Sequence, residues 1–343
     1  MRIPPPLEMR AELPAPREDL AFVLDARAQA EQILRRKIPR LALLVGPCSI
    51  HDPDLALEYG ERLKKLSSEI ENFFLIMRVF LEKPRTRAGW KGIVYDPHLD
   101  GSNDVVSGLK IARQLLLEMA KRKIPTATEL LEPLVVPYFE DLITWGLIGA
   151  RTSASQPHRQ MASGLPFPVG FKNDIHGELD VAICGILSAR MAHSFLHIDA
   201  RGQIAAVQTE GNPLTHLVLR GSETRPNFDP HSVSAGLSAL HVNHLEPSLL
   251  IDCSHGNSGK DHRRQHTAFE SVIDQSLHGN DAIAGLMLES HLFAGKQAVG
   301  DTQLRYGISI TDSCIGWDET ESLIRWADEK LSLRLTQDKS CLH

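Results

Sequence analysis

Four residues far apart in the sequence are of types that bind divalent metal ions. Their side chains offer one thiol, one imidazole and two carboxylates, and they are Cys48, His255, Glu289 and Asp312. This mixed donor set suits Mn²⁺, Fe²⁺, Co²⁺ or Zn²⁺ without selecting one of them. Because no C-x-x-C pair joins them, the pattern favours a catalytic metal with an open coordination position over a structural zinc. The spacing alone is a weak signal, since Cys48 could also be a plain buried hydrophobic residue.

A second set of candidate residues is cationic. It consists of Arg78, Lys83, Arg85, Arg151, Lys172 and Arg220. Guanidinium groups pair well with phosphate and carboxylate oxygens. Any one of these side chains could simply form a surface salt bridge, but six that converge need anions to offset their repulsion. We therefore expect a substrate that carries more than one phosphate or carboxylate group.

Most residues of both sets stand at or near the ends of short apolar runs, which suit strands buried on both faces. The runs cover residues 41–45, 73–80, 124–130, 147–150, 167–171, 217–219, 249–251 and 283–288. Amphipathic stretches of helical length lie between them, such as residues 55–66, 106–122, 135–144 and 179–192. This alternation predicts an α/β protein with a (β/α)₈ TIM barrel, in which catalytic groups follow the C-terminal strand ends. An open doubly wound sheet is the alternative, and the chain has neither nucleotide-binding glycine motif to support it.

Three further segments complete the predicted organisation. Residues 1–40 form an N-terminal arm and helix in front of a barrel over residues 41–335. Residues 194–208 are expected to form a β-hairpin inserted into the barrel, and residues 336–343 form a C-terminal tail.

Composition excludes several classes of protein. The 343 residues include 37 Lys and Arg against 43 Asp and Glu, a net charge of −6, which argues against nucleic acid as a partner. No apolar run approaches the roughly 18 residues of a membrane span, and the N-terminus lacks a secretory signal. Five cysteines, an odd and low number, fit a reducing cytoplasm better than a disulfide scaffold.

Motifs spread over residues 17–335 resemble those of the microbial class I 3-deoxy-D-arabino-heptulosonate 7-phosphate (DAHP) synthases. The segment EKPRT at residues 82–86, followed by GWKG at 89–92, is the most specific. The other motifs are GPCSIH at 46–51, GART at 149–152, PVGFKN at 168–173, DCSHGNS at 252–258 and SITDSCIGW at 309–317. The resemblance implies a (β/α)₈ barrel with an N-terminal helical extension and an inserted hairpin. It also implies condensation of phosphoenolpyruvate with erythrose 4-phosphate and water, the first step of the shikimate pathway to aromatic amino acids.

The resemblance assigns roles to both sets of residues. Cys48, His255, Glu289 and Asp312 match the metal ligands of the family, and the metal would act as a Lewis acid on the aldehyde oxygen. The phosphoenolpyruvate carboxylate would lie near Arg78, Lys83 and Lys172, and its phosphate near Arg151, Arg220 and the backbone N–H of Ala150.

The remaining assignments concern the aldehyde and the reacting groups. Arg85 and Thr86 match the pair that holds the phosphate of erythrose 4-phosphate, with Asp312 also beside this substrate. Glu129 would hold a water molecule next to phosphoenolpyruvate, and Lys83 would assist the developing alkoxide. Lys83, Arg78, Glu129 and His255 are thus the expected catalytic residues.

Regulation and assembly are also implied by the resemblance. Relatives are homodimers or homotetramers inhibited by an aromatic amino acid. Pro166 and His197 stand where regulated relatives usually have serine in the inhibitor pocket, so we expect inhibition to be altered or absent. Cys314, two residues beyond Asp312, could form a disulfide with Cys48 on metal-promoted oxidation.

Two rival functions stay open. The first is a 3-deoxy-octulosonate 8-phosphate synthase, which carries out the same type of reaction with arabinose 5-phosphate; the Lys83–Thr86 segment favours the four-carbon aldehyde. The second is a non-catalytic regulatory paralogue, and the presence of every metal ligand and cation argues against it.

Overall fold

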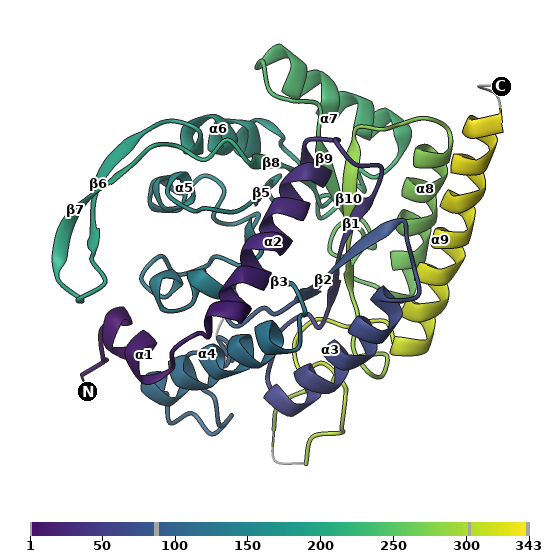
Figure 1. The fold of residues 1–343 in the computed structure, drawn as a ribbon. Helices are drawn as coiled ribbons and strands as arrows, with labels where there is room; N and C mark the ends of the chain where they lie inside the picture. The colour runs from purple at the N-terminus through teal and green to yellow at the C-terminus, as the bar shows by residue number, and fades with distance from the viewer. Residues whose placement is uncertain (1, 86–88, 301–302, 341–343) are drawn as a thin grey trace.

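The chain folds around a closed barrel of eight parallel strands (Figure 1). A computed structural model describes residues 2–85, 89–300 and 303–340. The strands follow one another around the barrel in the order β1, β10, β9, β8, β5, β4, β3, β2. Their bounds are β1 (Leu41–Gly46), β2 (Phe73–Arg78), β3 (Thr126–Glu129), β4 (Trp145–Ile148), β5 (Val169–Lys172), β8 (Thr215–Leu219), β9 (Leu249–Asp252) and β10 (Ile283–Glu289). The predicted (β/α)₈ barrel is therefore confirmed, and each strand overlaps one of the apolar runs.

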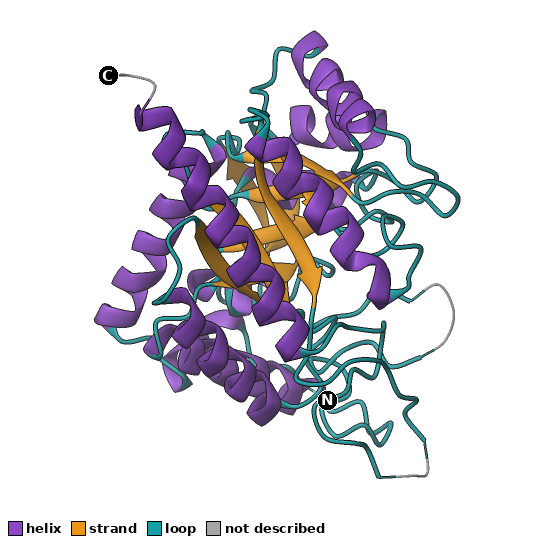
Figure 2. Ribbon diagram, turned by 90° about the vertical axis from the view of Figure 1, so that its right-hand side faces the viewer, coloured by secondary structure: helices purple, strands orange, loops and turns teal. Residues whose placement is uncertain are grey.

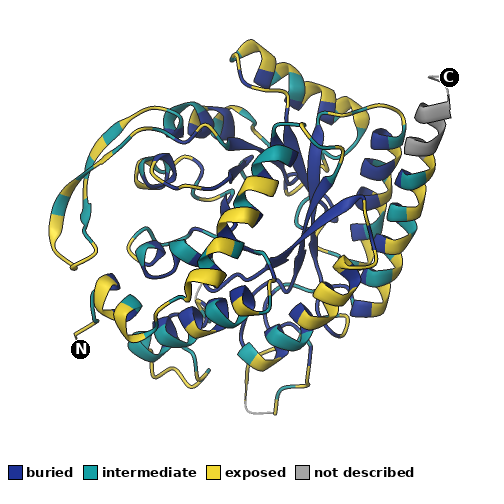
Figure 3. Cartoon of the chain, viewed as in Figure 1, coloured by how far each residue is buried: buried dark blue, intermediate teal, exposed yellow. Residues whose placement is uncertain are grey.

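Helices surround the barrel, as Figure 2 shows, and cover the outer faces of the strands. They are α3 (Pro53–Ser67), α4 (Val105–Lys121), α5 (Gln156–Ser163), α6 (Asp180–Ala189), α7 (Pro230–Val242), α8 (Gln265–Leu277) and α9 (Trp317–Ser340). Almost every strand residue is buried, and Figure 3 shows the strands as a continuous dark core. Strands that are buried on both faces need apolar side chains at successive positions, which explains the runs without polar alternation.

The segment between β3 and β4 departs from the expected helix over residues 135–144. It contains two short 3₁₀-helices, η1 (Val136–Tyr138) and η2 (Glu140–Leu142). Pro137 lacks an amide hydrogen, and Phe139 between the two turns adopts φ −148°, so a continuous α-helix cannot form there. A third 3₁₀-helix, η3 (His262–Arg264), leads into α8.

The N-terminal segment closes one end of the barrel. It comprises α1 (Pro6–Glu12) and α2 (Arg17–Leu34), and α2 buries Ala26, Ala30, Ile33 and Leu34 against interior residues such as Leu44. Because these contacts cover the end where the strands begin, the opposite end remains available for a site. No helix among the described residues is long and apolar enough to cross a membrane.

A hairpin projects from the barrel between α6 and β8 (Figure 1). It pairs β6 (His193–Ile198) with β7 (Ile204–Thr209) in antiparallel register, for example Phe195 with Val207. The N–H of Leu7 donates to the carbonyl of Ala200 at its turn, so the N-terminal arm is attached to it. The helical extension and the inserted hairpin therefore both agree with the predicted fold class.

Candidate active site

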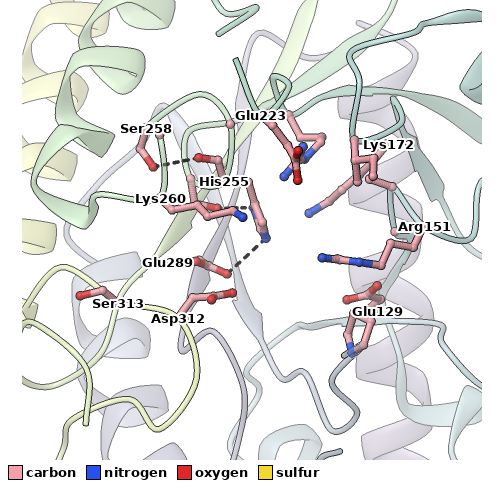
Figure 4. A pocket seen from close by; sticks show the side chains of 18 of the residues that line it. Glu129, Arg151, Lys172, Glu223, His255, Ser258, Lys260, Glu289, Asp312 and Ser313 are labelled. Atoms are coloured by element: carbon pink, nitrogen blue, oxygen red, sulfur yellow. Dashed lines mark hydrogen bonds and ion pairs between the residues drawn. The ribbon is translucent and has the colours of Figure 1, made fainter. Parts of the chain in front are cut away.

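The C-terminal ends of the strands surround a pocket of about 470 Å³. Residues from the loops after all eight strands contribute to this site or lie directly beneath it, and Figure 4 shows side chains pointing into it from several of them. Predicted residues that line the pocket are Lys83, Arg85, Glu129, Ala150, Arg151, Lys172, Arg220, His255, Glu289 and Asp312. Cys48 and Arg78 lie beneath this lining. The structure thus brings the two candidate sets into one place.

Three of the four candidate metal ligands converge closely. One donor atom each of Cys48, Glu289 and Asp312 lies within 4.8 Å of the others. Strand pairing explains part of this, because Gly46 at the end of β1 is in register with Glu289 at the end of β10, and Cys48 follows two residues later. The backbone N–H of Asp312 donates to Cys48 Sγ at 3.4 Å, which holds the third residue against the first.

His255 lies at the edge of this group. Its Nε2 is 3.8 Å from Glu289 Oε1, the contact drawn as a dashed line in Figure 4. Its Nδ1 lies 2.9 Å from Asp252 Oδ2 and 2.7 Å from Ser254 Oγ. A carboxylate that accepts from Nδ1–H leaves Nε2 as an acceptor, an arrangement common for histidines that bind metals.

Asp252 is a functional residue that the sequence analysis did not single out. It ends β9, is fully buried, and accepts a hydrogen bond from Lys172 Nζ at 2.7 Å as well as facing His255. Burial opposes its charge, but the ammonium of Lys172 and the hydrogen bond from His255 outweigh this and hold its pKa well below the usual range. Asp252 therefore fixes His255, one of the candidate metal ligands, and Lys172, one of the candidate cations. In the sequence, Asp252 can be recognised as an acidic residue that stands three positions before His255 at the predicted end of a strand.

Lys83 is buried against the candidate metal ligands. Its Nζ donates to Cys48 Sγ at 2.6 Å and to Asp312 Oδ2 at 2.9 Å. Burial disfavours the ammonium, yet Cys48, Asp312 and Glu289 together raise the pKa of Lys83 above its usual value. Lys83 in turn keeps the pKa of Asp312 far below the usual range. Lys83 is therefore charged, and Asp312 is an anion.

The donor set fits a divalent metal ion. One sulfur and two carboxylates face the same point, with the Nε2 atom of His255 beside Glu289, and mixed S, N and O sites of this kind hold Mn²⁺, Fe²⁺, Co²⁺ or Zn²⁺. Burial and the charge of Glu289 raise the pKa of Cys48, so the thiol must lose its proton to bind a metal. Cys48, Glu289, Asp312 and His255 are the residues that would hold the ion.

Arg78 is fully buried behind Glu289. Its Nη2 donates to Glu289 Oε1 at 3.1 Å, and its guanidinium lies 4.0 Å from the centre of the Phe80 ring. Nε and Nη1 have no hydrogen-bond partner within the described part of the chain. Buried N–H groups are rarely left unpaired, so this arginine indicates a missing anionic partner at the base of the pocket.

The other cations stand around the opposite wall. Lys172 ends β5, Arg151 follows β4, and Arg220 follows β8; Figure 4 shows Lys172 and Arg151 facing His255 across the pocket. Burial lowers the pKa of Arg220, partly offset by Asp252. Arg220 is therefore a desolvated cation, which strengthens its attraction for an anion.

Glu129, at the end of β3, reaches this wall because Gly149 leaves room for it. A Cβ on Gly149 would lie 2.2 Å from Glu129 Oε1, so a larger residue would displace the carboxylate. Glu129 therefore lies beside Ala150 and Arg151. This position is compatible with its predicted role of holding a water molecule.

Three further predicted residues are Arg85, Thr86 and Cys314. Arg85 lines the pocket as an exposed side chain, whereas Thr86 lies outside the described residues. Cys314 is buried, and its Sγ donates to the carbonyl of Asp312 at 3.6 Å. Burial raises the pKa of Cys314 to about 12, and its disulfide with Cys48 stays a prediction.

Comparison with known proteins identifies the family. The model of the DAHP synthetase I family matches residues 23–325. The chain belongs to this family. It is 46% identical over 334 residues to the phospho-2-dehydro-3-deoxyheptonate aldolase, Tyr-sensitive, of Escherichia coli K12, covering 96% of this chain and 94% of that protein. It is 44% identical over 321 residues to the Trp-sensitive enzyme of the same organism, covering 93% of this chain and 92% of that one.

A solved structure agrees with this assignment. The phospho-2-dehydro-3-deoxyheptonate aldolase of Francisella tularensis SCHU S4 superimposes with a TM-score of 0.95 at 39% identity, covering 97% of this chain and 98% of that one. The similarity to this structure therefore extends over nearly the whole chain.

Proposed function

We propose that this protein is a metal-dependent DAHP synthase (EC 2.5.1.54). It condenses phosphoenolpyruvate with D-erythrose 4-phosphate and water, giving 3-deoxy-D-arabino-heptulosonate 7-phosphate and inorganic phosphate. The observation that carries the proposal is the pocket in which six lysine and arginine side chains surround a Cys–Glu–Asp group with His255 beside it. Membership of a family whose relatives bear this enzyme name supports it.

The residues divide the work of binding. In this proposal Arg78, Lys83 and Lys172 hold the carboxylate of phosphoenolpyruvate, and the Arg78 N–H groups that lack a partner donate to it. Arg151, Arg220 and the backbone N–H of Ala150 hold its phosphate. Arg85 and Thr86 hold the phosphate of the aldehyde. Fixing two anions side by side screens their repulsion and aligns the reacting carbons.

The chemistry needs one proton and one water in defined places. C3 of phosphoenolpyruvate attacks the aldehyde carbon, and the charged Lys83, 2.9 Å from Asp312, donates toward the alkoxide that forms. Glu129 orients the water that adds at C2, after which the phosphate group leaves. Cys48, His255, Glu289 and Asp312 would hold a divalent metal ion, which would supply Lewis acidity toward the aldehyde. Mn²⁺, Fe²⁺, Co²⁺ and Zn²⁺ are all compatible with these donors.

The choice of aldehyde tests this proposal against its nearest rival. We expect purified protein to consume phosphoenolpyruvate rapidly with erythrose 4-phosphate and at least about a hundredfold more slowly with arabinose 5-phosphate, since differences of ~3 kcal/mol are typical of mispaired polar groups. Measuring phosphoenolpyruvate loss with each aldehyde decides the matter. Equal or faster turnover of arabinose 5-phosphate would support a 3-deoxy-octulosonate 8-phosphate synthase instead. No turnover of either would support a non-catalytic paralogue.

A second cavity supports a proposal about regulation. It measures about 750 Å³ and is lined by residues of α1, the α5–β5 connection and the hairpin, including Arg10, Ser163, Pro166 and His197. The two positions expected in the inhibitor pocket therefore lie in one cavity. We propose that it corresponds to the effector site that the Tyr- and Trp-sensitive names of relatives imply, with binding of an aromatic amino acid weakened or lost in this chain. Pro166 offers no hydroxyl or N–H, and His197 Nδ1 contacts the carbonyl of Ile198, so fewer polar groups remain for a ligand.

We expect tyrosine, tryptophan and phenylalanine to inhibit the wild-type protein weakly or not at all. The double variant Pro166→Ser/His197→Ser should gain inhibition by about tenfold or more for one of them, because each new hydroxyl can contribute ~1 kcal/mol. Activity is measured while each amino acid is titrated. Strong inhibition of the wild type, unchanged in the double variant, would contradict the role given to these two positions.

Assembly and location complete the proposal. The hairpin exposes Leu196 and Ile204 on one face, which favours a homodimer or homotetramer. A buried Cys48 thiol that must stay reduced to bind metal favours the cytoplasm. Phosphoenolpyruvate and erythrose 4-phosphate remain the expected partners, with neither nucleic acid nor membrane among them.

A further inference from the structure

Lys260 is a cation of the pocket that none of the roles above uses. It lines the pocket together with His255 and Asp312. Figure 4 shows its side chain extending into the pocket beside His255, on the side opposite Arg151 and Lys172. Its side chain is exposed, so it meets a substrate at the rim.

The loop that carries Lys260 is held in a defined conformation. The N–H of Lys260 donates to the carbonyl of His255 at 2.8 Å, which closes a turn between the two residues. The N–H of Asn257, inside the turn, donates to the carbonyl of Arg220, and its Nδ2 donates to the carbonyl of Asp252. The loop is therefore attached to the ends of β8 and β9 and positions Lys260 together with His255.

The backbone of this loop is strained at both ends of the turn. His255 has φ +53° and Lys260 has φ +62°, in the left-handed region that residues other than glycine seldom adopt. Such conformations cost about 1–2 kcal/mol per residue and persist where the surrounding structure enforces them, frequently at functional sites. The strain indicates that the surrounding structure holds the side chains of His255 and Lys260 in defined positions.

The charge of Lys260 is not balanced by a neighbouring acid. Lys83 is paired with Asp312 and Lys172 with Asp252, but within the described residues Lys260 forms no ion pair. The adjacent Asp261 accepts instead from the guanidinium of Arg263 at 2.9 and 3.0 Å. A cation without a counter-ion in an already cationic pocket calls for an anion from the substrate.

The order of the strands indicates which anion this is. β1 and β10, which end beside Cys48 and at Glu289, lie between β2 and β9 in the barrel. The loop after β2 carries Arg85, and the loop after β9 carries Lys260. The two cations therefore flank the Cys–Glu–Asp group on either side, whereas the proposed phosphoenolpyruvate residues Arg151 and Lys172 follow β4 and β5.

We propose that Lys260 binds the phosphate of erythrose 4-phosphate, opposite Arg85. This assignment rests on the function proposed above. With its aldehyde directed at the Cys–Glu–Asp group, the sugar extends toward the rim between the two loops, and its dianionic phosphate meets a cation from each. Lys260 is then a specificity-determining residue, because the position of its ammonium limits how long an aldehyde the rim accepts.

Steady-state kinetics of Lys260→Ala, with both substrates varied, test this role. We expect the KM for erythrose 4-phosphate to rise about tenfold or more, as removal of a charge-assisted hydrogen bond implies. The KM for phosphoenolpyruvate and the melting temperature should stay at wild-type values. Lys260→Arg should recover most of the affinity, and Lys64→Ala, an exposed lysine on α3, should behave as wild type.

Other results would contradict either the role of Lys260 or the proposed function. Unchanged KM values in Lys260→Ala, with an active wild type, would refute the role of Lys260 alone. A rise confined to the KM for phosphoenolpyruvate would assign Lys260 to the other substrate and also refute the proposal. A wild type that turns over neither substrate would refute the proposed function itself.

Discussion

Replacing Lys83 with methionine is expected to lower kcat by about a thousandfold or more, the range observed when a buried group that stabilises developing charge is removed. The ammonium lies 2.6 Å from Cys48 Sγ and 2.9 Å from Asp312 Oδ2, in the interior of the pocket. Methionine preserves most of the length and the apolar stem, but it cannot donate a proton to the alkoxide. It also leaves Cys48 Sγ and Asp312 Oδ2 without the ammonium that donates to them.

The measurement compares kcat, the far-ultraviolet circular dichroism spectrum and the melting temperature of wild type and Lys83→Met. Lys110→Met is the matched control, because Lys110 forms an ion pair with Glu12 on the outside of the barrel. A folded Lys83→Met protein with kcat within about tenfold of wild type would remove Lys83 from the chemistry, since general acid catalysis contributes about 10² to 10⁴.

Asp252→Asn should lower both the metal affinity and the stability of the protein. The fully buried carboxylate accepts from Lys172 at 2.7 Å and faces His255 Nδ1 at 2.9 Å. Asparagine keeps the shape but removes the charge, so Lys172 is left without its counter-ion and the orientation of His255 is no longer fixed. We expect metal affinity to fall about 10- to 100-fold, as for other residues that orient a metal-binding histidine. Breaking the buried ion pair should also lower the free energy of unfolding by about 3–5 kcal/mol.

Metal titration and urea unfolding of the same Asp252→Asn preparation separate the two effects. Asp261→Asn serves as the control, because Asp261 lies on the same loop but pairs with the exposed Arg263. Metal affinity and stability that both match wild type would show that Asp252 neither orients His255 nor balances Lys172. Loss of stability with unchanged metal affinity would confine its role to the ion pair.

The barrel could be predicted because its strands carry a strong local signal. Strands such as β1 and β10 are buried on both faces. Burial on both faces requires apolar residues at successive positions, and such runs are visible in the sequence. Each strand ends within two residues of the end of its run, so the residues at one end of the barrel could be grouped from the sequence. The grouping of Cys48 with Glu289 is a consequence of this rule, whereas Asp312 lies well beyond the end of β10, in the loop that leads to α9.

Other features depend on contacts that no local pattern reveals. The role of Asp252 arises from Lys172, 80 residues earlier, so its carboxylate could not be distinguished from any other strand-end acid. Gln265 is a similar case, since its side chain bonds both the N–H and the carbonyl of Glu289 and fixes the end of β10. The depth of Arg78 behind Glu289 likewise depends on how the strands tilt. Residues 135–144 had helical periodicity, but the backbone at Pro137 and Phe139 overrode it.

In the proposed reaction, one pocket joins two phosphorylated substrates through a new carbon–carbon bond. The most direct test mixes purified protein with phosphoenolpyruvate, erythrose 4-phosphate and each of Mn²⁺, Fe²⁺, Co²⁺ and Zn²⁺. Phosphoenolpyruvate loss, inorganic phosphate release and the seven-carbon product are measured together. We predict equal molar amounts of all three with at least one metal, and none when erythrose 4-phosphate is omitted. Phosphate release without the seven-carbon product, or no reaction with any metal, would contradict the account.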